Sequence, residues 1–187
     1  MRGETKLIIP NQVGREQLYN YLLESCEQEE FQHDDYIRSQ LSTDLAYDGS
    51  WQENLGYIAS RLQRYSSQRD KLKGESFVHG FTLAMASLNR FYRPVSEQDC
   101  QQGYVDLFLR PELEIYKDMR HSYIIELKYA KSKDTDQRVE LLRQEAIAQA
   151  HRYADTEVVK RGVGHTQLHQ IVVVYRGMEM VVCEEIA

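Results

Sequence analysis

The sequence is poor in cysteine and in long apolar runs. Its three cysteines, Cys26, Cys100 and Cys183, are far apart and form no Cys-x-x-Cys pair. This pattern argues against a disulfide framework and against a zinc site built on cysteine pairs. The longest apolar runs, such as residues 171–175, fall far short of the roughly 20 residues that a membrane helix needs. The first ten residues lack the apolar core of a secretory signal, so we expect a soluble, cytoplasmic protein.

Several catalytic motifs and an excess of positive charge are also missing. There is no Gly-x-x-x-x-Gly-Lys-Ser/Thr motif, which argues against an ATPase site in this chain, and no Gly-x-Ser-x-Gly or Cys–His signature. The 23 Lys and Arg residues are outnumbered by 29 Asp and Glu residues, giving a formal net charge of −6. This balance argues against a broad basic surface that holds nucleic acid by itself. Nucleic-acid contact would have to be local, assisted by metal ions, or shared with another chain or domain.

What is present is typical of an ordinary folded protein with two parts. The chain has 187 residues, of which 42% are hydrophobic and 28% charged, enough for one compact domain and a subdomain. Residues 1–70 carry most of the acidic excess, with 7 Lys and Arg against 12 Asp and Glu. Helical periodicity after Pro10, over 34–47 and over 50–65 predicts a helical subdomain there. Its expected function is connection or interaction.

From residue 71 onward, helices alternate with strands. Apolar spacing predicts helices over about 73–89 and about 137–155, the second with Asp136 as a possible N-cap. β-type runs over 103–109 and 122–130, with one before them, predict an antiparallel meander, and two further strands follow near the C-terminus. The pattern over residues 71–187 therefore predicts an α/β domain that consists of a mixed sheet flanked by helices.

Charged residues interrupt two of the most apolar predicted strands. Side chains alternate between the faces of a strand, so Glu126 and Lys128 share one face. Asp106 can meet Glu126 if the two strands pair. Two carboxylates beside apolar residues repel each other and lose hydration, and a divalent cation relieves both effects. Oxygen ligands of this kind favour Mg²⁺ or Mn²⁺.

Each of these features also has an ordinary interpretation. A Glu-x-Lys triplet on an edge strand is commonly a solvated surface. Gln149 and Tyr153 lie one turn apart on the apolar side of a predicted helix, where a glutamine can cap a buried carbonyl instead of reaching a cleft. His79, one turn after Glu75, is expected to be a helix-surface histidine with satisfied hydrogen bonds.

Two weaker signals concern histidines and lysines. His165 and His169 have the spacing of a helical zinc pair, but Gly162, Gly164 and the strand expected from about Leu168 predict a loop, so no zinc site is expected. A modest basic patch borders the predicted acid pair. Its cations are Lys128, Lys131, Lys133, Arg138 and Arg143, and its acids are Asp134, Asp136 and Glu140.

Taken in order, these motifs resemble the PD-(D/E)XK nuclease superfamily. GYVDLFL, IIELK and QAHRY are similar to the branch that ends in Gln-x-x-x-Tyr, as in RecB-type nucleases. The longer string from KGESFVHGF to AIAQAHRYA is similar to the nuclease domain at the C-terminus of predicted bacterial AAA-type ATPases. The resemblance covers about residues 71–187 and departs from the family pattern at Val105, which replaces a proline. It implies a restriction-endonuclease-like fold.

The resemblance also implies a role for each matching residue. Asp106 and Glu126 would bind the divalent metal, helped by the backbone carbonyl of Leu127, and Glu75 would complete the metal shell.

Lys128 would orient or activate the attacking water and stabilise charge on the phosphate. Gln149 and Tyr153 would position the lysine or a DNA phosphate.

Three functions remain open at this point. The first is a metal-dependent nuclease that hydrolyses DNA phosphodiester bonds with Mg²⁺, because a carboxylate-held metal beside an ammonium activates water and relieves phosphate charge. The second is a non-catalytic module that binds nucleic acid or protein and is associated with an AAA-type ATPase. The third is a helical adaptor that acts through residues 1–70.

Overall fold

The structure is a computed structural model that describes residues 35–66, 74–95 and 106–186. The helix predicted after Pro10, the boundary predicted at residue 70 and the first three residues of the strand predicted over 103–109 lie outside these ranges. Cys26 and Cys100 lie outside them as well.

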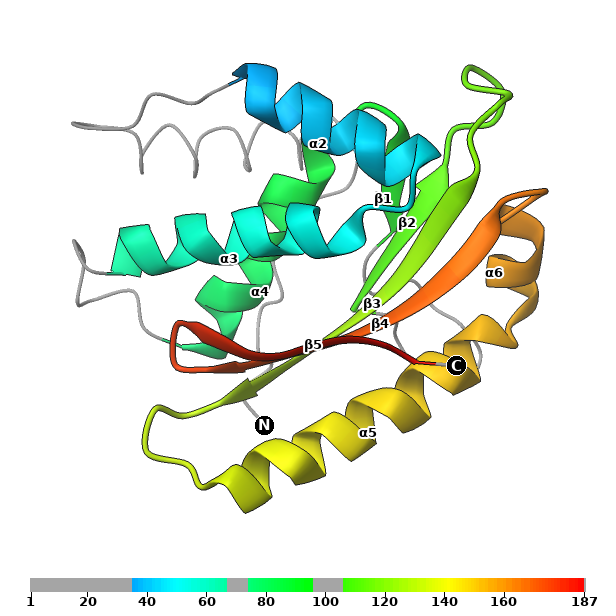
Figure 1. Ribbon diagram of the computed structural model, residues 1–187. Helices are drawn as coiled ribbons and strands as arrows, with labels where there is room; N and C mark the ends of the chain where they lie inside the picture. The colour runs from blue at the N-terminus through cyan, green and yellow to red at the C-terminus, as the bar shows by residue number, and fades with distance from the viewer. Residues whose placement is uncertain (1–34, 67–73, 96–105, 187) are drawn as a thin grey trace, which may run out of the picture. The chain divides into compact units, whose positions relative to one another are not determined.

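Five strands of the described chain form one mixed sheet (Figure 1). In order across the sheet they are β1 (Tyr92–Val95), β2 (Leu107–Pro111), β3 (His121–Ala130), β4 (Gln167–Arg176) and β5 (Glu179–Ile186). β1, β2 and β3 are antiparallel neighbours, β4 runs parallel to β3, and β5 is antiparallel to β4. The predicted meander and the predicted mixed sheet are confirmed.

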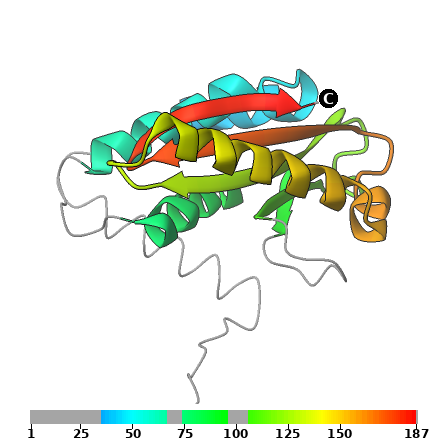
Figure 2. The same cartoon turned by 90° about the horizontal axis from the view of Figure 1, so that it is seen from below.

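Helices cover both faces of this sheet (Figures 1 and 2). They are α2 (Asp35–Tyr47), α3 (Trp51–Ser66), α4 (Glu75–Ser87), α5 (Asp136–Ala154) and the short α6 (Glu157–Gly162), which the sequence did not predict. α2, α3 and α4 lie on one face and α5 lies on the other, where with α6 it provides the crossover that parallel strands β3 and β4 require. No helix of the described chain is both long and apolar enough to span a membrane.

The start of α5 differs from the prediction by one residue. Thr135, and not Asp136, is the N-cap, because its hydroxyl accepts a hydrogen bond from the backbone N–H of Arg138 at 3.3 Å. Asp136 is instead the first helical residue, and its carboxylate lies 2.7 Å from the guanidinium of Arg176 in β4. The helix is therefore joined to the sheet at its first turn.

Alternation along β3 decides which side chains face which helices. Ile124 packs in a buried cluster with Tyr153 of α5. Tyr123 points the other way, and its hydroxyl donates a hydrogen bond to the carbonyl of Leu45 in α2 at 2.7 Å. Glu126 and Lys128, two and four positions after Ile124, therefore lie on the face that α5 covers.

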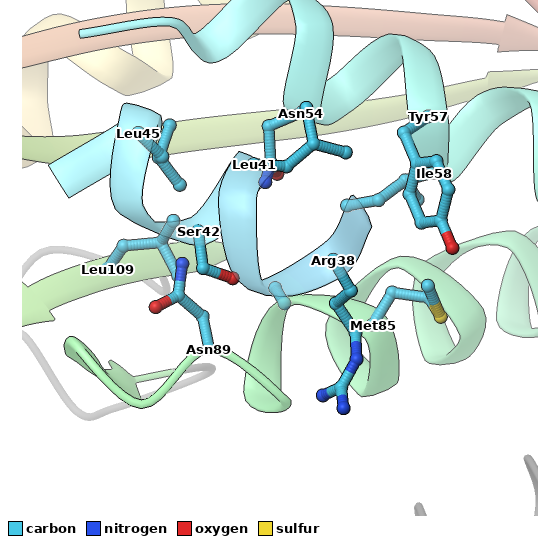
Figure 3. Close-up of a pocket in the computed structure, with 11 residues that line it drawn as sticks. Arg38, Leu41, Ser42, Leu45, Asn54, Tyr57, Ile58, Met85, Asn89 and Leu109 are labelled. Atoms are coloured by element: carbon cyan, nitrogen blue, oxygen red, sulfur yellow. The ribbon is translucent and has the colours of Figure 1, made fainter. Parts of the chain in front are cut away.

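A small cavity lies among α2, α3 and α4 (Figure 3). Its volume is about 20 Å³, and its lining includes Arg38, Ser42, Tyr57 and Met85. A volume of this size accommodates a molecule no larger than water. This cavity is therefore too small to be a substrate pocket.

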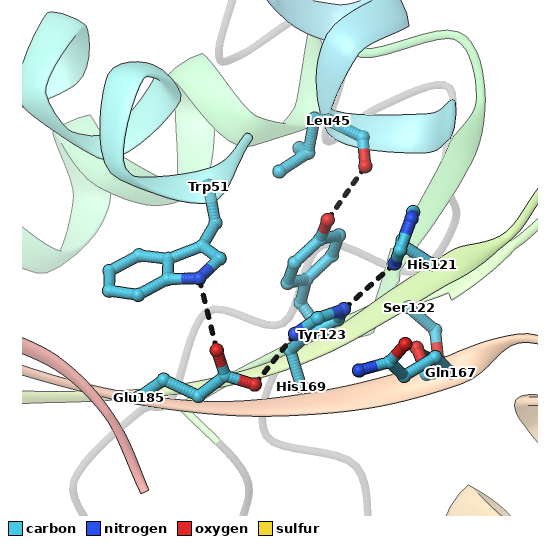
Figure 4. A network of polar contacts seen from close by, with 8 residues as sticks. All are labelled: Leu45, Trp51, His121, Ser122, Tyr123, Gln167, His169 and Glu185. Atoms are coloured by element: carbon cyan, nitrogen blue, oxygen red, sulfur yellow. Dashed lines mark hydrogen bonds and ion pairs between the residues drawn. The ribbon is translucent and has the colours of Figure 1, made fainter. Parts of the chain in front are cut away.

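A hydrogen-bond network joins the helices to the face opposite α5 (Figure 4). The indole N–H of Trp51 donates to Oε2 of Glu185 at 3.3 Å, and Oε1 of Glu185 lies 2.7 Å from Nδ1 of His169. Nε2 of His169 lies 2.8 Å from Nδ1 of His121. The ring of Tyr123 stacks on His169, with centroids 5.0 Å apart. The network connects α3 to three neighbouring strands.

Both histidine rings in this network are held by partners. Because Nδ1 of His169 faces a carboxylate, it donates to Oε1 of Glu185, and Nε2 of His169 and Nδ1 of His121 share one hydrogen bond. Burial lowers the pKa of His121, and the neighbouring His169 ring lowers it further. Both nitrogens of His169 and Nδ1 of His121 are therefore paired.

We predict that His169→Leu lowers the free energy of unfolding by about 1–3 kcal/mol, because Glu185 and His121 both lose a hydrogen-bond partner. Urea denaturation would measure the change. The control is Arg161→Leu, which removes an ion pair whose side chains are 83% and 77% exposed. That pair should contribute less than about 0.5 kcal/mol. Equal losses in the two variants would contradict a stabilising role for the network.

Candidate functional site

The pairing of β2 with β3 brings the two predicted acids together. Leu107 lies opposite Ile125, so Asp106, one residue earlier, comes beside Glu126. The charge of Asp106 disfavours the ionised form of Glu126. The two acids are 20 positions apart in the sequence, and the pairing of β2 with β3 makes them neighbours.

Asp106 is held in place by the strand that it faces. Its Oδ2 accepts a hydrogen bond from the backbone N–H of Leu127 at 2.9 Å and lies 3.4 Å from Nζ of Lys128. The same ammonium is 3.6 Å from Oε2 of Glu126. Lys128 therefore lies close to both carboxylates, and its side chain is largely buried.

Glu126 is a buried carboxyl group that lacks hydrogen-bond donors. It is fully buried, and neither of its oxygens has a hydrogen-bond partner among the described residues. Its pKa is raised from the ordinary 4.5 to about 8: burial is the largest cause, the charge of Asp106 adds to the shift, and Lys128 opposes it. A cation bound to the carboxylate would relieve the same unfavourable terms. Two neighbouring carboxylates, of which Glu126 has unsatisfied oxygens, fit a hard divalent ion such as Mg²⁺ or Mn²⁺.

α5 places Gln149 above the part of β3 that carries the charges. Ala146 packs in the cluster that contains Ala130, and Ala150 packs in the cluster that contains Ile124. Gln149, between these two alanines, is thus positioned over the middle of β3. Its Oε1 is buried and has no hydrogen-bond partner within the part of the chain that the structure describes. This oxygen can accept a hydrogen bond.

Tyr153 lies one turn further along α5, in apolar surroundings. It is buried with Phe108, two residues after Asp106, and with Ile124, two residues before Glu126. The aromatic ring therefore packs beside the acids and on the same face of the sheet. In this position it holds α5 against β2 and β3.

Glu75 and His79 lie on α4, on the other face of the sheet from α5. Glu75 is the first residue of α4 and is exposed. The described residues contain no group of three or more His, Cys, Asp or Glu side chains arranged to hold a metal ion, so Glu75 does not join Asp106 and Glu126. Its part in a metal shell stays a prediction. Nε2 of His79 is buried and has no partner among these residues, which differs from the satisfied surface histidine expected from the sequence.

The two histidines with zinc-like spacing do not meet. Nε2 of His165 lies 3.1 Å from the carbonyl oxygen of Met119, whereas His169 lies within β4 and contacts His121. The prediction that they do not form a helical pair is confirmed. The sequence analysis missed the His121–His169 contact, because these residues are 48 positions apart and become neighbours only when β3 and β4 align in parallel.

Comparison with known proteins identifies the family. The model of the PD-(D/E)XK nuclease superfamily matches residues 73–185, which run from just before α4 nearly to the end of β5. No curated protein and no solved structure matches the chain. The matched segment is more than half of the chain, and it includes the strands that bring Asp106, Glu126 and Lys128 together. The chain therefore belongs to the PD-(D/E)XK nuclease superfamily and has its restriction-endonuclease-like α/β fold.

Proposed function

We propose that this chain is a metal-dependent nuclease that hydrolyses the phosphodiester bonds of DNA. The observation that supports this most directly is the environment of Glu126, a buried carboxyl group with no hydrogen-bond donor in the described chain, beside Asp106 and Lys128. An acid with a purely structural role would have its oxygens satisfied, because unpartnered buried polar groups are costly. This arrangement suits an acid that binds a cation.

The proposed metal is Mg²⁺ or Mn²⁺. Asp106, Glu126 and the backbone carbonyl of Leu127 would hold it, and Glu75, which does not lie with the other two acids in the described chain, would complete the shell through a water molecule. Bound there, the ion would supply charge neutralisation at the phosphate and would acidify a water molecule. The N–H of Leu127 orients Asp106 through its 2.9 Å hydrogen bond.

Lys128 is the proposed catalytic cation. Its ammonium lies next to both carboxylates, from where it can donate hydrogen bonds to the attacking water or to a non-bridging phosphate oxygen. The unpartnered oxygen of Gln149 can accept from this ammonium or from the water and so fix its direction. Tyr153 would act through packing, because it holds α5 over the site.

A non-catalytic module is the second candidate function. It would bind nucleic acid or protein in association with an AAA-type ATPase, to whose nuclease domains the sequence is similar. The observation that favours it is the position of Glu75, which does not gather with the other two acids in the described chain. Association with an AAA-type ATPase and a cytoplasmic location are parts of the proposal for either function.

We predict that Asp106→Ala and Lys128→Ala each reduce DNA cleavage by about 100-fold or more, because each removes a group that acts directly on the reacting phosphate or its metal. The measurement is cleavage of plasmid and linear DNA with Mg²⁺ or Mn²⁺. Asp118→Ala is the matched control, since this acid lies in the β2–β3 connection and contacts Tyr47. Equal cleavage by wild type and both site variants would identify a contaminating nuclease.

We also predict that, in EDTA, the free energy of unfolding falls as the pH rises, owing to Glu126. Its pKa is about 8 in the folded protein and near 4.5 in the unfolded chain, so the folded state binds the proton more tightly. The stabilisation from this group is complete below about pH 4.5 and is lost as the pH rises through about 8. Glu126→Gln should remove this part of the decline, which urea denaturation would measure between about pH 4.5 and about pH 8.

Added metal separates the two candidate functions in the same experiment. Mg²⁺ or Mn²⁺ should raise the Tm of the wild type, because an ion that binds only the folded state stabilises it. Glu126→Gln should show little or no increase. No shift in the wild type, with DNA present or absent, would favour the non-catalytic module.

A further inference from the structure

The basic patch expected over residues 128–143 divides into two kinds of cation in the structure. Arg143 is hydrogen-bonded to Glu184 of β5, and Arg138 lies 3.9 Å from Glu145 of its own helix. The charges of these two arginines are thus compensated within the protein. They have little charge left for a ligand.

Lys131 and Lys133, unlike the two arginines, have side chains with no acidic partner among the described residues. Both lie in the short loop that joins β3 to α5, both are exposed, and neither makes an ion pair with any residue that the structure describes. This loop directly follows the strand that carries Lys128. The two lysines are therefore the cations of the patch that remain available to an anionic partner.

The β3–α5 loop has a fixed shape. Oδ2 of Asp134 accepts a hydrogen bond from the N–H of Lys131 at 2.8 Å, and the N–H of Asp134 donates to the carbonyl of Lys131 at 2.9 Å. On the other side, Gly177 in the β4–β5 turn donates its N–H to the carbonyl of Ala130 at 2.8 Å. The contact is close, since a Cβ on Gly177 would lie 2.5 Å from Oγ of Ser132. The backbone positions of both lysines are thereby set.

The loop borders a concave surface that α3 and the β4–β5 turn also line. Ser132, between the two lysines, lines an open hollow of about 560 Å³ together with Gln63, Arg176, Met178 and Glu179. Lys131 follows Lys128 by three residues, or roughly 10 Å of extended chain. A nucleic-acid strand in a duplex has one phosphate per roughly 3.4 Å of axis, so Lys131 is within about three nucleotides of a phosphate held at Lys128.

We propose that Lys131 and Lys133 bind the phosphate backbone of the nucleic-acid strand next to the phosphate that is cleaved. The inference rests on the proposed nuclease function and adds the surface that holds the substrate. Contacts of this kind fix the position of the strand and carry no base sequence. Binding through these lysines is therefore independent of sequence and sensitive to salt.

The test is the affinity of Lys131→Ala/Lys133→Ala for a fluorescein-labelled 20-bp DNA duplex, measured by anisotropy with Ca²⁺ in place of Mg²⁺. We expect the Kd to rise about 10-fold or more and the slope of log K against log salt to become shallower by about 2, one unit for each lost phosphate contact. Lys131→Arg/Lys133→Arg should keep the wild-type Kd and slope. In cleavage assays the loss should appear in KM.

Lys160→Ala is the matched control, because its ammonium is 3.3 Å from Asp155 at the far end of α5. An unchanged Kd and slope in the double alanine variant would overturn the proposal. If the wild type also cleaves DNA and Asp106→Ala does not, only the lysine assignment fails. If the wild type neither binds nor cleaves DNA, the proposed function fails with it.

Discussion

The rest of the site depends on the burial of one carboxyl group, that of Glu126, in the middle of a sheet. A charged acid removed from water without hydrogen-bond donors is destabilising, and the nearest charges are a repelling acid and a single ammonium. The burial of apolar residues in the surrounding sheet offsets this destabilisation. The central residues of β4 beside it, 171–175, are almost completely buried. The apolar centre of the domain therefore supports an arrangement that is unfavourable by itself.

The two faces of β3 differ in whether their polar side chains have hydrogen-bond partners. On one face, Tyr123 and the His121–His169 pair join the sheet to α2 and α3, with the polar groups of the network satisfied. On the other face, Glu126 and the amide oxygen of Gln149 have buried oxygens without partners. A satisfied network fixes positions, whereas unsatisfied oxygens remain available to a ligand. Neighbouring side chains along the strand thus have different roles: those on one face hold the helices, and those on the other can bind a ligand.

Local patterns in the sequence predicted most of the fold and part of the site. The two-residue period of a strand is local, so the shared face of Glu126 and Lys128 could be predicted, and strand pairing then brought Asp106 beside them. Contacts between distant segments could not be predicted in this way. The His121–His169 contact and the placement of α4 relative to Asp106 and Glu126 depend on how whole elements pack. At α5, two adjacent residues, Thr135 and Asp136, could both cap the helix, and local geometry selected the threonine.

The order of strands in the sheet has a consequence for how the acid becomes buried. β2 and β3 are joined by a short connection, so this hairpin can form as soon as both strands have left the ribosome, whereas β4 reaches β3 only after the whole α5–α6 crossover has been made. Asp106 and Glu126 can therefore meet while still hydrated. We therefore expect Glu126 to lose its hydration only when the crossover helix docks and the parallel strand closes the sheet.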